Sequence, residues 1–262
     1  MTGELFPAGA AFDAIAESFD TRFAPWRSVA AQRRAVRGEL RAAFPEPARL
    51  LEIGGGTGED AGWLIEQGHS VLLTDAAPAM AAVAARKLGR ATEALAAEQL
   101  GLLADRGERF DGAFSNFAAL NCVPDLAPVA EGLGQLLRPG GRAVLVLFGT
   151  FCPGEWVTEA ARGRFGNMFR RFARDEVPAR LGGRHFTVRY HRAGEIAAAM
   201  APWFEPRGAR AIGLCVPPSA AEPWISRHPH LLRGMEAVDR ALARPLAPLG
   251  DHVLYHFERR PD

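Results

Sequence analysis

Short apolar runs alternate with stretches of helical periodicity along this 262-residue chain. In the helical stretches apolar residues recur every three or four positions, whereas the strand-like runs are continuous or alternating. We expect strands over residues 49–53, 70–74, 110–116, 142–148, 183–190, 209–216 and 252–258. Helices are expected over residues 59–67, 131–137 and 195–200. This alternation predicts an α/β fold built on a doubly wound, mostly parallel sheet.

Some regions do not fit the simple alternation. Residues 10–44 have a helical pattern that Pro25 interrupts, and they precede the first strand. A third strand should lie within residues 89–109, yet that stretch is rich in alanine and has the period of a helix. Residues 149–182 and 217–249 are additional segments between the expected elements of the sheet.

A glycine cluster follows the first apolar run. Gly54, Gly56 and Gly58 would let the backbone turn sharply and approach a ligand, and the next helix would point its free N–H groups at that ligand. The dinucleotide spacing G-x-G-x-x-G would require glycine where Glu59 stands. Glu59 and Asp60 would repel a pyrophosphate at this helix end, so a ligand with cationic groups, such as S-adenosylmethionine (SAM), fits better.

An acidic residue ends the second strand-like run. Asp75 lies 21 residues after Gly54, where a doubly wound fold places the carboxylate that binds both hydroxyls of a ribose. The residue favours a nucleoside ligand, and it would suit NAD as well as SAM.

The motifs around these residues resemble those of the class I SAM-dependent methyltransferases. Residues 51–58 resemble the first motif of that family, although Gly55 replaces the usual cysteine or serine. Residues 75–80 resemble its Asp-x-x-Pro-x-Met segment, and residues 110–116 its Phe-Asp-x-x-x-x-Asn segment. The chain is most similar to methyltransferase domain types 11 and 25 within this class.

Two further motifs strengthen the resemblance. Residues 137–141 match the family's Leu-x-Pro-Gly-Gly turn between a helix and a buried strand. Residues 12–16 resemble the Tyr-Asp-x-Ile-Ala opening of many members, in which an N-terminal helix folds over the cofactor. Phe12 stands in place of the tyrosine, so a phenolic contact is lost.

The resemblance implies a Rossmann-like doubly wound mixed sheet with an antiparallel last strand and helical lid insertions. It implies one domain over residues 1–262, with an N-terminal helical cap at 1–47 and lid or acceptor insertions at 149–182 and 217–249. The cofactor would be SAM and the product S-adenosylhomocysteine. On this resemblance the cofactor-binding residues are Phe12, Glu52, Gly54, Gly55, Gly56, Thr57, Gly58, Asp75, Ala76, Met80, Glu98, Gln99, Leu100, Asn116, Phe117 and Ala118.

The acceptor site should lie where the cap and both insertions converge, because ligands bind beyond the C-terminal ends of parallel strands. Trp156, Phe169 and Trp224 should then lie on the same side as the glycine turn. A base is needed only if the acceptor is protonated, and the candidates are His185 and then Tyr190. The arginines of residues 162–184 could bind an acidic acceptor or form a solvated face.

Composition narrows the function classes. A formal net charge of +1 gives no reason to expect a nucleic acid or a membrane as partner. The three cysteines are far apart, which indicates a reducing compartment and neither a disulfide framework nor a metal site. We expect a cytoplasmic monomer or homodimer without a signal peptide that methylates an oxygen or nitrogen of a small metabolite.

Two other functions stay open at this point. One is an NAD(P)-dependent oxidoreductase that shares the glycine turn, although Lys87 is the only lysine and cannot form a Tyr-x-x-x-Lys motif. The other is a SAM-binding subunit without catalytic activity.

Overall fold

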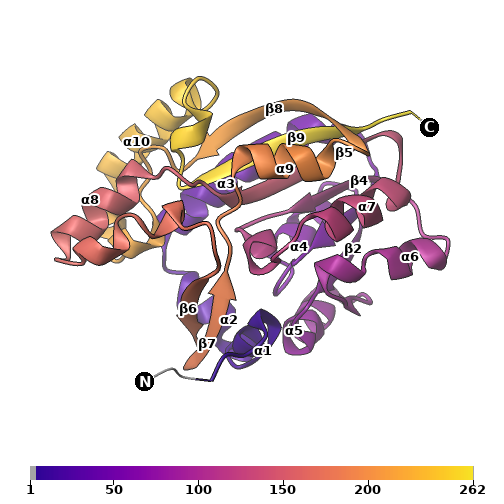
Figure 1. Ribbon diagram of the computed structural model, residues 1–262, viewed down its shortest axis with the longest axis horizontal. Coiled ribbons are helices and arrows are strands. Elements are labelled where there is room, and N and C mark those ends of the chain that lie inside the picture. The colour runs from indigo at the N-terminus through magenta and orange to yellow at the C-terminus, as the bar shows by residue number, and fades with distance from the viewer. Residues whose placement is uncertain (1–3, 262) are drawn as a thin grey trace.

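The computed structural model describes residues 4–261. Its centre is a seven-stranded sheet of order β3-β2-β1-β4-β5-β9-β8 (Figure 1). β9 is antiparallel to both neighbours, β5 and β8, and the other strands of the sheet run parallel to one another. The strands are β1 (Arg49–Ile53), β2 (Ser70–Asp75), β3 (Glu93–Ala94), β4 (Phe110–Ser115), β5 (Leu137–Phe148), β8 (Phe204–Ile212) and β9 (His252–Arg259). The predicted fold class is confirmed, including the antiparallel last strand.

Helices cover both faces of the sheet, because successive side chains of a strand point to opposite sides. Leu50 of β1 packs in a core shared with α3, α4 and α5, whereas Leu51 packs in the opposite core with α6, α7 and α9. Both faces of β1 are therefore buried, which explains its continuous apolar sequence. These helices are α3 (Arg27–Ala43), α4 (Glu59–Glu66), α5 (Pro78–Leu88), α6 (Gly101–Asp105), α7 (Ala127–Leu136) and α9 (Ala193–Met200).

The structure corrects several element boundaries. β8, the sixth strand of the main sheet along the chain, covers Phe204–Ile212 and not residues 209–216. Pro206 and Gly208 disguise its first half, and the pairing with β9 shifts register between them. A proline is tolerated there because β8 is an edge strand. The Pro-Gly-Gly turn also lies within β5, which begins at Leu137.

The third strand, which was expected within residues 89–109, is very short. β3 is two residues long, and a 3₁₀ turn, η2 (Ala97–Gln99), and the short helix α6 follow it. The helical periodicity of residues 89–109 therefore describes most of the segment, and the strand contributes only the edge beside Asp75.

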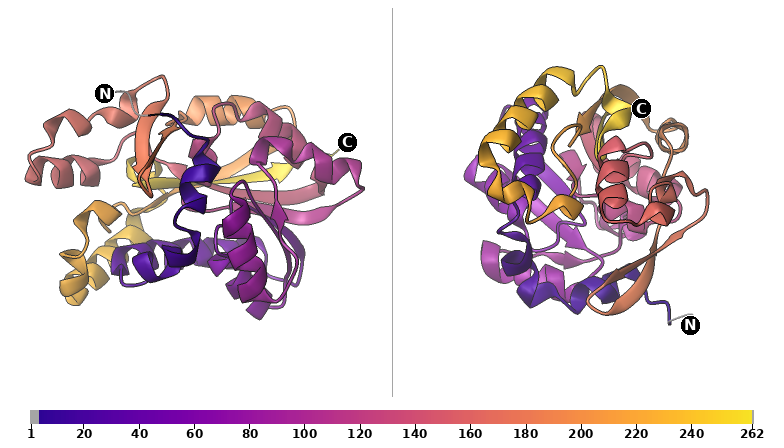
Figure 2. Two further views of the ribbon diagram at one scale, coloured as in Figure 1. Left: turned by 90° about the horizontal axis from the view of Figure 1, so that it is seen from below. Right: turned by 90° about the vertical axis from the view of Figure 1, so that its left-hand side faces the viewer.

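The N-terminal segment and the two insertions lie at the end of the sheet where β5 stops and β9 begins (Figures 1 and 2). A single helix before Pro25 was expected, and the chain instead forms three short turns. These are α1 (Ala8–Asp13), η1 (Ala16–Ser18) and α2 (Phe19–Phe23). The first insertion contains α8 (Pro153–Ala161), η4 (Phe165–Asn167), η5 (Arg170–Phe172) and a hairpin of β6 (Val177–Leu181) and β7 (Arg184–Val188).

The second insertion is mainly helical. It contains η6 (Ser219–Ala221), η7 (Ile225–Arg227), α10 (Pro229–Leu242) and η8 (Ala247–Leu249). Within residues 4–261, none of the helices is both long and apolar enough to span a bilayer.

Candidate active site

The glycine turn between β1 and α4 depends on residues that lack a side chain. Gly54, Gly56 and Gly58 have φ values of +65°, +55° and +79°, a region that other residues rarely adopt. A Cβ on Gly54 would lie 2.4 Å from the Cβ of Ala119. A Cβ on Gly56 would meet no atom within 4 Å, so its backbone faces open space. A ligand can therefore approach the chain directly at Gly56.

The departure from the family motif at Gly55 has a steric cause. A Cβ at this position would lie 2.6 Å from Cγ and Cδ1 of Leu73 and 2.8 Å from Cδ of Glu52. Both neighbours are buried, so the cysteine or serine usual in the family would require this part of the core to rearrange.

The Asp75 carboxylate lies beside the open glycine. It accepts hydrogen bonds from the backbone N–H of Gly56 and of Ala77, each at 2.8 Å. Burial raises the pKa of Asp75, although these two donors oppose the shift. A carboxylate offers about four acceptor positions, so it can still accept hydrogen bonds from a diol.

The carboxyl group of Glu52 lies below the turn, and one of its oxygens lacks a hydrogen-bond partner. Glu52 is 2% exposed, and within the described chain its Oε2 has no hydrogen-bond partner. Burial, and then the charge of Asp60, holds the pKa of Glu52 well above its ordinary value. This orphaned acceptor and the open backbone at Gly56 fit a ligand that carries both a diol and cationic groups.

The acidic start of α4 is already paired with cations. Arg37 Nε donates to Asp60 Oδ1 at 2.8 Å, and Arg33 Nε lies 3.6 Å from Oδ2. Asn116 Nδ2 also donates to Asp60 Oδ2 at 2.8 Å. Lys87 pairs with the exposed Glu59. These cations compensate much of the negative charge of Glu59 and Asp60, so Asp75 and Glu52 are the acidic groups that a ligand at the turn would meet.

The turn after β4 closes the next part of the edge. Phe117 and Ala118 adopt positive φ values of 49° and 60°, which are strained for residues with a side chain. Asn116 Oδ1 accepts the N–H of Phe117 at 2.7 Å, and Ala118 N donates to Val146 O at 3.1 Å. These bonds hold residues 116–118, which were predicted to bind the cofactor, in place between the glycine turn and β5.

Glu98, Gln99 and Leu100, which were predicted to bind the cofactor, follow β3, the strand that pairs with Asp75. Glu98 and Gln99 are exposed in η2, whereas the Leu100 side chain is fully buried in the core. Burial, and then the charges of Asp75 and Glu98, raise the pKa of the Cys122 thiol to about 12. The structure thus brings Glu98 and Asp75 to one region around Cys122.

The N-terminal segment is fastened over the glycine turn. Asp20 Oδ1 accepts a hydrogen bond from Thr57 Oγ1 at 2.5 Å, and Asp13 Oδ1 accepts the N–H of Ala79 at 2.8 Å. Phe12 and Met80 belong to the apolar cluster between this segment and α5. A Cβ on Gly9 would lie 2.7 Å from the carbonyl oxygen of Ala76, so α1 packs directly on the residue after Asp75.

The structure separates the two candidate bases. His185 lies on β7, and among residues 4–261 no hydrogen bond to its side chain is found. Its neighbour Phe186 is buried and packs on Phe12 at 5.9 Å, so His185 points to the other side of the strand. Tyr190 is 5% exposed and packs on Phe148 at 5.7 Å. Burial raises the pKa of Tyr190, so its phenol stays protonated at neutral pH.

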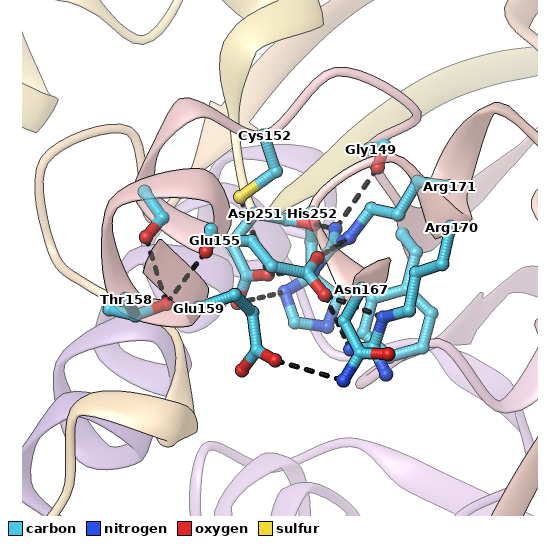
Figure 3. A network of polar contacts seen from close by, with 12 residues as sticks. Gly149, Cys152, Glu155, Thr158, Glu159, Asn167, Arg170, Arg171, Asp251 and His252 are labelled. Atoms are coloured by element: carbon cyan, nitrogen blue, oxygen red, sulfur yellow. Dashed lines mark hydrogen bonds and ion pairs between the residues drawn. The ribbon is translucent and has the colours of Figure 1, made fainter. Parts of the chain in front are cut away.

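The predicted arginine cluster divides into two kinds of residue. Arg171 is 5% exposed and donates to Asp251 Oδ1 at 2.7 Å and to the carbonyls of Gly149 and Asp251 at 3.0 and 2.6 Å. It also pairs with the buried Glu155 (Figure 3). Its donors are therefore used inside the protein. Arg162, Arg164, Arg174 and Arg180 are exposed, as a solvated face would be.

The structure adds a site residue that the sequence reasoning missed. His252, the first residue of β9, pairs with Phe148 at the end of β5. Its ring stacks on that of Phe148 at 4.8 Å and meets Phe117 edge-on at 6.1 Å. Because β9 is antiparallel, its first residue lies where the parallel strands end. The expectation of an antiparallel last strand was the signal that could have located it.

Known proteins share this architecture. A model of the methyltransferase domain, type 12, matches residues 51–143. The biotin biosynthesis bifunctional protein BioHC of Cellvibrio japonicus (strain Ueda107) is 31% identical over 140 residues, which are 52% of this chain and 27% of that protein. The chain therefore matches little more than a quarter of that relative's length. The matching domain type differs from types 11 and 25, whereas the class agrees.

Two solved structures illustrate the similarity. A SAM-dependent methyltransferase of Listeria monocytogenes has a TM-score of 0.58 and 15% identity, with 89% of this chain and 100% of that chain covered. The 1,6-didemethyltoxoflavin-N1-methyltransferase of Burkholderia thailandensis, with its substrate and S-adenosylhomocysteine bound, has a TM-score of 0.51 and 23% identity. That match covers 100% of this chain and 93% of the other. Residues 51–143 match the methyltransferase domain family, and the fold of the chain is that of these solved SAM-dependent methyltransferases.

Proposed function

We propose that this chain is a methyltransferase that binds SAM at the glycine turn and methylates an oxygen or nitrogen of a small molecule. The observation that carries the proposal is the open backbone of Gly56 beside the Asp75 carboxylate. When bound, SAM supplies a methyl group that its sulfonium makes electrophilic. Asp75 would accept the ribose hydroxyls, and Glu52 would face the cationic part of the ligand.

The charges at the turn favour SAM over a dinucleotide. Glu59 and Asp60 occupy the first turn of α4, where a pyrophosphate would need uncompensated N–H groups and a positive end of the helix. Glu52 adds a buried carboxyl group below the turn, and because burial raises its pKa, a cationic ligand would favour its ionised form. A sulfonium and an ammonium would be attracted by the same charges that repel a pyrophosphate.

The remaining domain organisation follows from the proposal. The cap at residues 1–47 and the insertions at 149–182 and 217–249 would exclude water and form the acceptor site. Hydrogen bonds between the cap and the second insertion support this arrangement. Ser28 of α3 donates its N–H and its hydroxyl to Glu222 at 2.9 and 2.7 Å. Gln32 Nε2 of the same helix donates to Asp251 Oδ2 at 3.1 Å. Such closure aligns reactants and strengthens electrostatic interactions.

The walls of this region favour a flat, partly apolar acceptor. Phe151, Trp156 and Phe172 lie within 6.1 Å of one another by ring centroids, and Phe148 carries Tyr190 and His252 on its ring. A small-molecule acceptor is also what the Burkholderia neighbour is described as methylating.

Isothermal titration calorimetry with SAM, S-adenosylhomocysteine and NAD tests the cofactor assignment. Binding of the first two and none of NAD is expected. In Gly56→Ala, the new methyl group would enter the open space and should weaken SAM binding at least about tenfold. Gly89→Ala is the matched control, because Gly89 has a φ of +61° and equally open surroundings at the end of α5.

Unchanged SAM affinity in Gly56→Ala would place the cofactor elsewhere. Conversion of SAM to S-adenosylhomocysteine with a panel of small phenols and amines then separates an enzyme from a SAM-binding partner subunit. A protein that binds SAM with the expected dependence on Gly56 but turns over none of the panel would favour the subunit.

A further inference from the structure

His252 occupies a position that its neighbours define closely. Its side chain is 7% exposed, and its Nδ1 lies 3.4 Å from Oδ2 of Asp251. The contact is within ion-pair distance, and within the described residues no hydrogen bond to the buried Nδ1 is found. Catalytic hydrogen bonds are often this long before substrate binds. Phe148 stacked at 4.8 Å fixes the plane of the imidazole.

Asp251 is held by three distant parts of the chain. Arg171 of the first insertion donates to Oδ1 at 2.7 Å, and Gln32 of α3 donates to Oδ2 at 3.1 Å. Cys152 Sγ lies 3.9 Å from Oδ1 (Figure 3). Asp251 is 3% exposed, so its carboxylate cannot move away from His252 without breaking these contacts.

The second ring nitrogen of His252 is available. Among residues 4–261, no hydrogen-bond partner of Nε2 is found, and this atom is not one of the buried unsatisfied atoms. A neutral imidazole with its proton on Nδ1, toward Asp251, carries its lone pair on Nε2. The histidine is oriented by its ring contacts, with Nδ1 beside the Asp251 carboxylate and Nε2 reaching accessible space.

The charged and titratable groups around this histidine come from several elements. They are Asp251 beside it, Arg171 and Glu155 of the first insertion, Cys152 before α8, Tyr190 after β7 and Arg33 of α3 over Phe117. Arg171 is already neutralised by Asp251 and Glu155. The local charges therefore nearly balance, and a hydroxyl group can approach His252 without a large electrostatic penalty.

We propose that His252 is the general base of this enzyme and that the acceptor is a hydroxyl group on a planar aromatic compound. His252 Nε2 takes the hydroxyl proton while the acceptor oxygen forms its bond to the methyl carbon and the carbon–sulfur bond breaks. The bonding electrons remain on sulfur, which leaves as the thioether of S-adenosylhomocysteine. The proton then passes from His252 to water. This proposal rests on the proposed function.

The chemistry selects the acceptor class. A neutral amine or an ionised carboxylate already has a free electron pair, so neither requires a base for methyl transfer. A phenol is mostly protonated at neutral pH, and an oriented base can accelerate its reaction by roughly 10²–10⁴-fold. The imidazole lies among aromatic rings, because Phe148 stacks on it and Phe117 meets it edge-on, and such surroundings favour an aromatic acceptor.

The first test needs no turnover. Diethyl pyrocarbonate acylates accessible, unprotonated imidazole nitrogens, and peptide mass spectrometry locates the labelled residues. We expect His252 to be labelled and bound S-adenosylhomocysteine together with phenol to protect it. His256 is the internal comparison, because it is on the same strand and its Nε2 is engaged by Glu39 at 3.2 Å. Failure to label His252 while other histidines react would contradict an accessible Nε2.

The second test separates base catalysis from folding and cofactor binding. His252→Gln and the control His256→Gln are compared with phenol and with 4-nitrophenol, which ionises much more readily. His252→Gln should lose about 10²-fold or more in turnover of phenol, lose less than about tenfold with 4-nitrophenol, and keep its SAM affinity. His256→Gln should behave as the wild type with both.

Each other outcome has a definite meaning. Equal losses with both phenols would reduce His252 to a structural role. A wild type that binds SAM but methylates neither phenol would contradict the hydroxyl acceptor and leave the SAM-dependent function intact. A wild type that does not bind SAM would contradict the proposed function itself.

Discussion

The candidate site has two halves along the same edge of the sheet, and one is shaped by backbone atoms whereas the other is shaped by side chains. The cofactor half, comprising the glycine turn, Asp75 and residues 116–118, is shaped by backbone atoms from contiguous motifs. The acceptor half, comprising Phe148, Arg171, Asp251 and His252, is shaped by side chains from separate parts of the chain. The first half can bind a ligand shared by many enzymes, whereas the second can change through individual substitutions.

A pair of buried carboxylates shows the same contrast. Glu52 of the cofactor half keeps an unpartnered oxygen, and burial holds its pKa well above the ordinary value. Burial alone would also raise the pKa of Asp251 in the acceptor half, but His252 and Arg171 outweigh it and hold that pKa well below its usual range. Glu52 is therefore suited to a cation that a ligand brings, whereas Asp251 already has its cation and serves the fold.

The largest effect is expected from Arg171→Met, which should lower the free energy of unfolding by about 3–5 kcal/mol. The substitution leaves Asp251 and Glu155 buried without their shared cation. Urea denaturation followed by circular dichroism measures the change. Arg170→Met is the control, because Arg170 pairs with the same Glu155 but its side chain is 42% exposed; it should cost less than about 1 kcal/mol. Equal losses would show that burial of the Arg171 pair does not matter.

In the cofactor half, the expected change is in binding. Asp75→Ala should raise the dissociation constant of SAM roughly 30- to 100-fold, because two hydrogen bonds to a charged acceptor are lost. Its effect on unfolding without ligand should be smaller than that of Arg171→Met. Calorimetry measures the affinity, and Asp105→Ala, an exposed residue at the end of α6, should change nothing. An unaltered affinity in Asp75→Ala would remove this carboxylate from the site.

A substitution at Gly55 tests whether packing explains why glycine replaces the cysteine or serine that is usual in the family. Gly55→Ala should cost about 1–3 kcal/mol, because its Cβ would overlap the Leu73 side chain. Leu73→Ala alone should cost about 2–5 kcal/mol through the cavity it leaves. The double variant should lose less than the sum by about 0.5 kcal/mol or more, as measured by a urea double-mutant cycle. Simple additivity would mean that Leu73 does not exclude a side chain at position 55.

Most of the cofactor half could be predicted from the sequence, because its residues lie in short, contiguous motifs. The strand before Gly54, the glycine spacing and the acid at position 75 each follow from short-range rules, and β1 agrees with the predicted residues 49–53. Glu98 was inferred by resemblance alone, and it lies near Asp75 only through the fold. The cofactor contacts themselves stay predictions.

The acceptor half could not be foreseen in the same way. Arg171, Asp251 and Gln32 are separated by 80 to 219 residues, and no local pattern reports that they meet. His185 was favoured for its place after two glycines, whereas the position of His252 depends on the direction of β9 relative to β5. Strand pairing, and not sequence spacing, determines which histidine stands at the site edge.

The smallest expected effects are opposite pH dependences of Glu52→Gln and Asp251→Asn. The lowered pKa of Asp251 means that its contribution to stability is present above about pH 4 and lost below it. Asp251→Asn should therefore be less stable than the wild type at neutral pH, and the gap should begin to narrow as the pH falls below 4. The raised pKa of Glu52 has the reverse sign, because the wild type loses stability as the pH rises above about 4.3.

Glu52→Gln should accordingly match the wild type in acid and exceed its stability at neutral pH, while it binds SAM more weakly. Thermal unfolding of both variants and the wild type between about pH 3 and pH 8 measures these differences, with SAM affinity determined in parallel at neutral pH. If both variants changed with pH in the same direction, the two carboxylates would not be in opposite electrostatic environments. A Glu52→Gln variant that gains stability and also keeps full SAM affinity would show that the orphaned oxygen serves no ligand, because relief of its burial would then cost the site nothing.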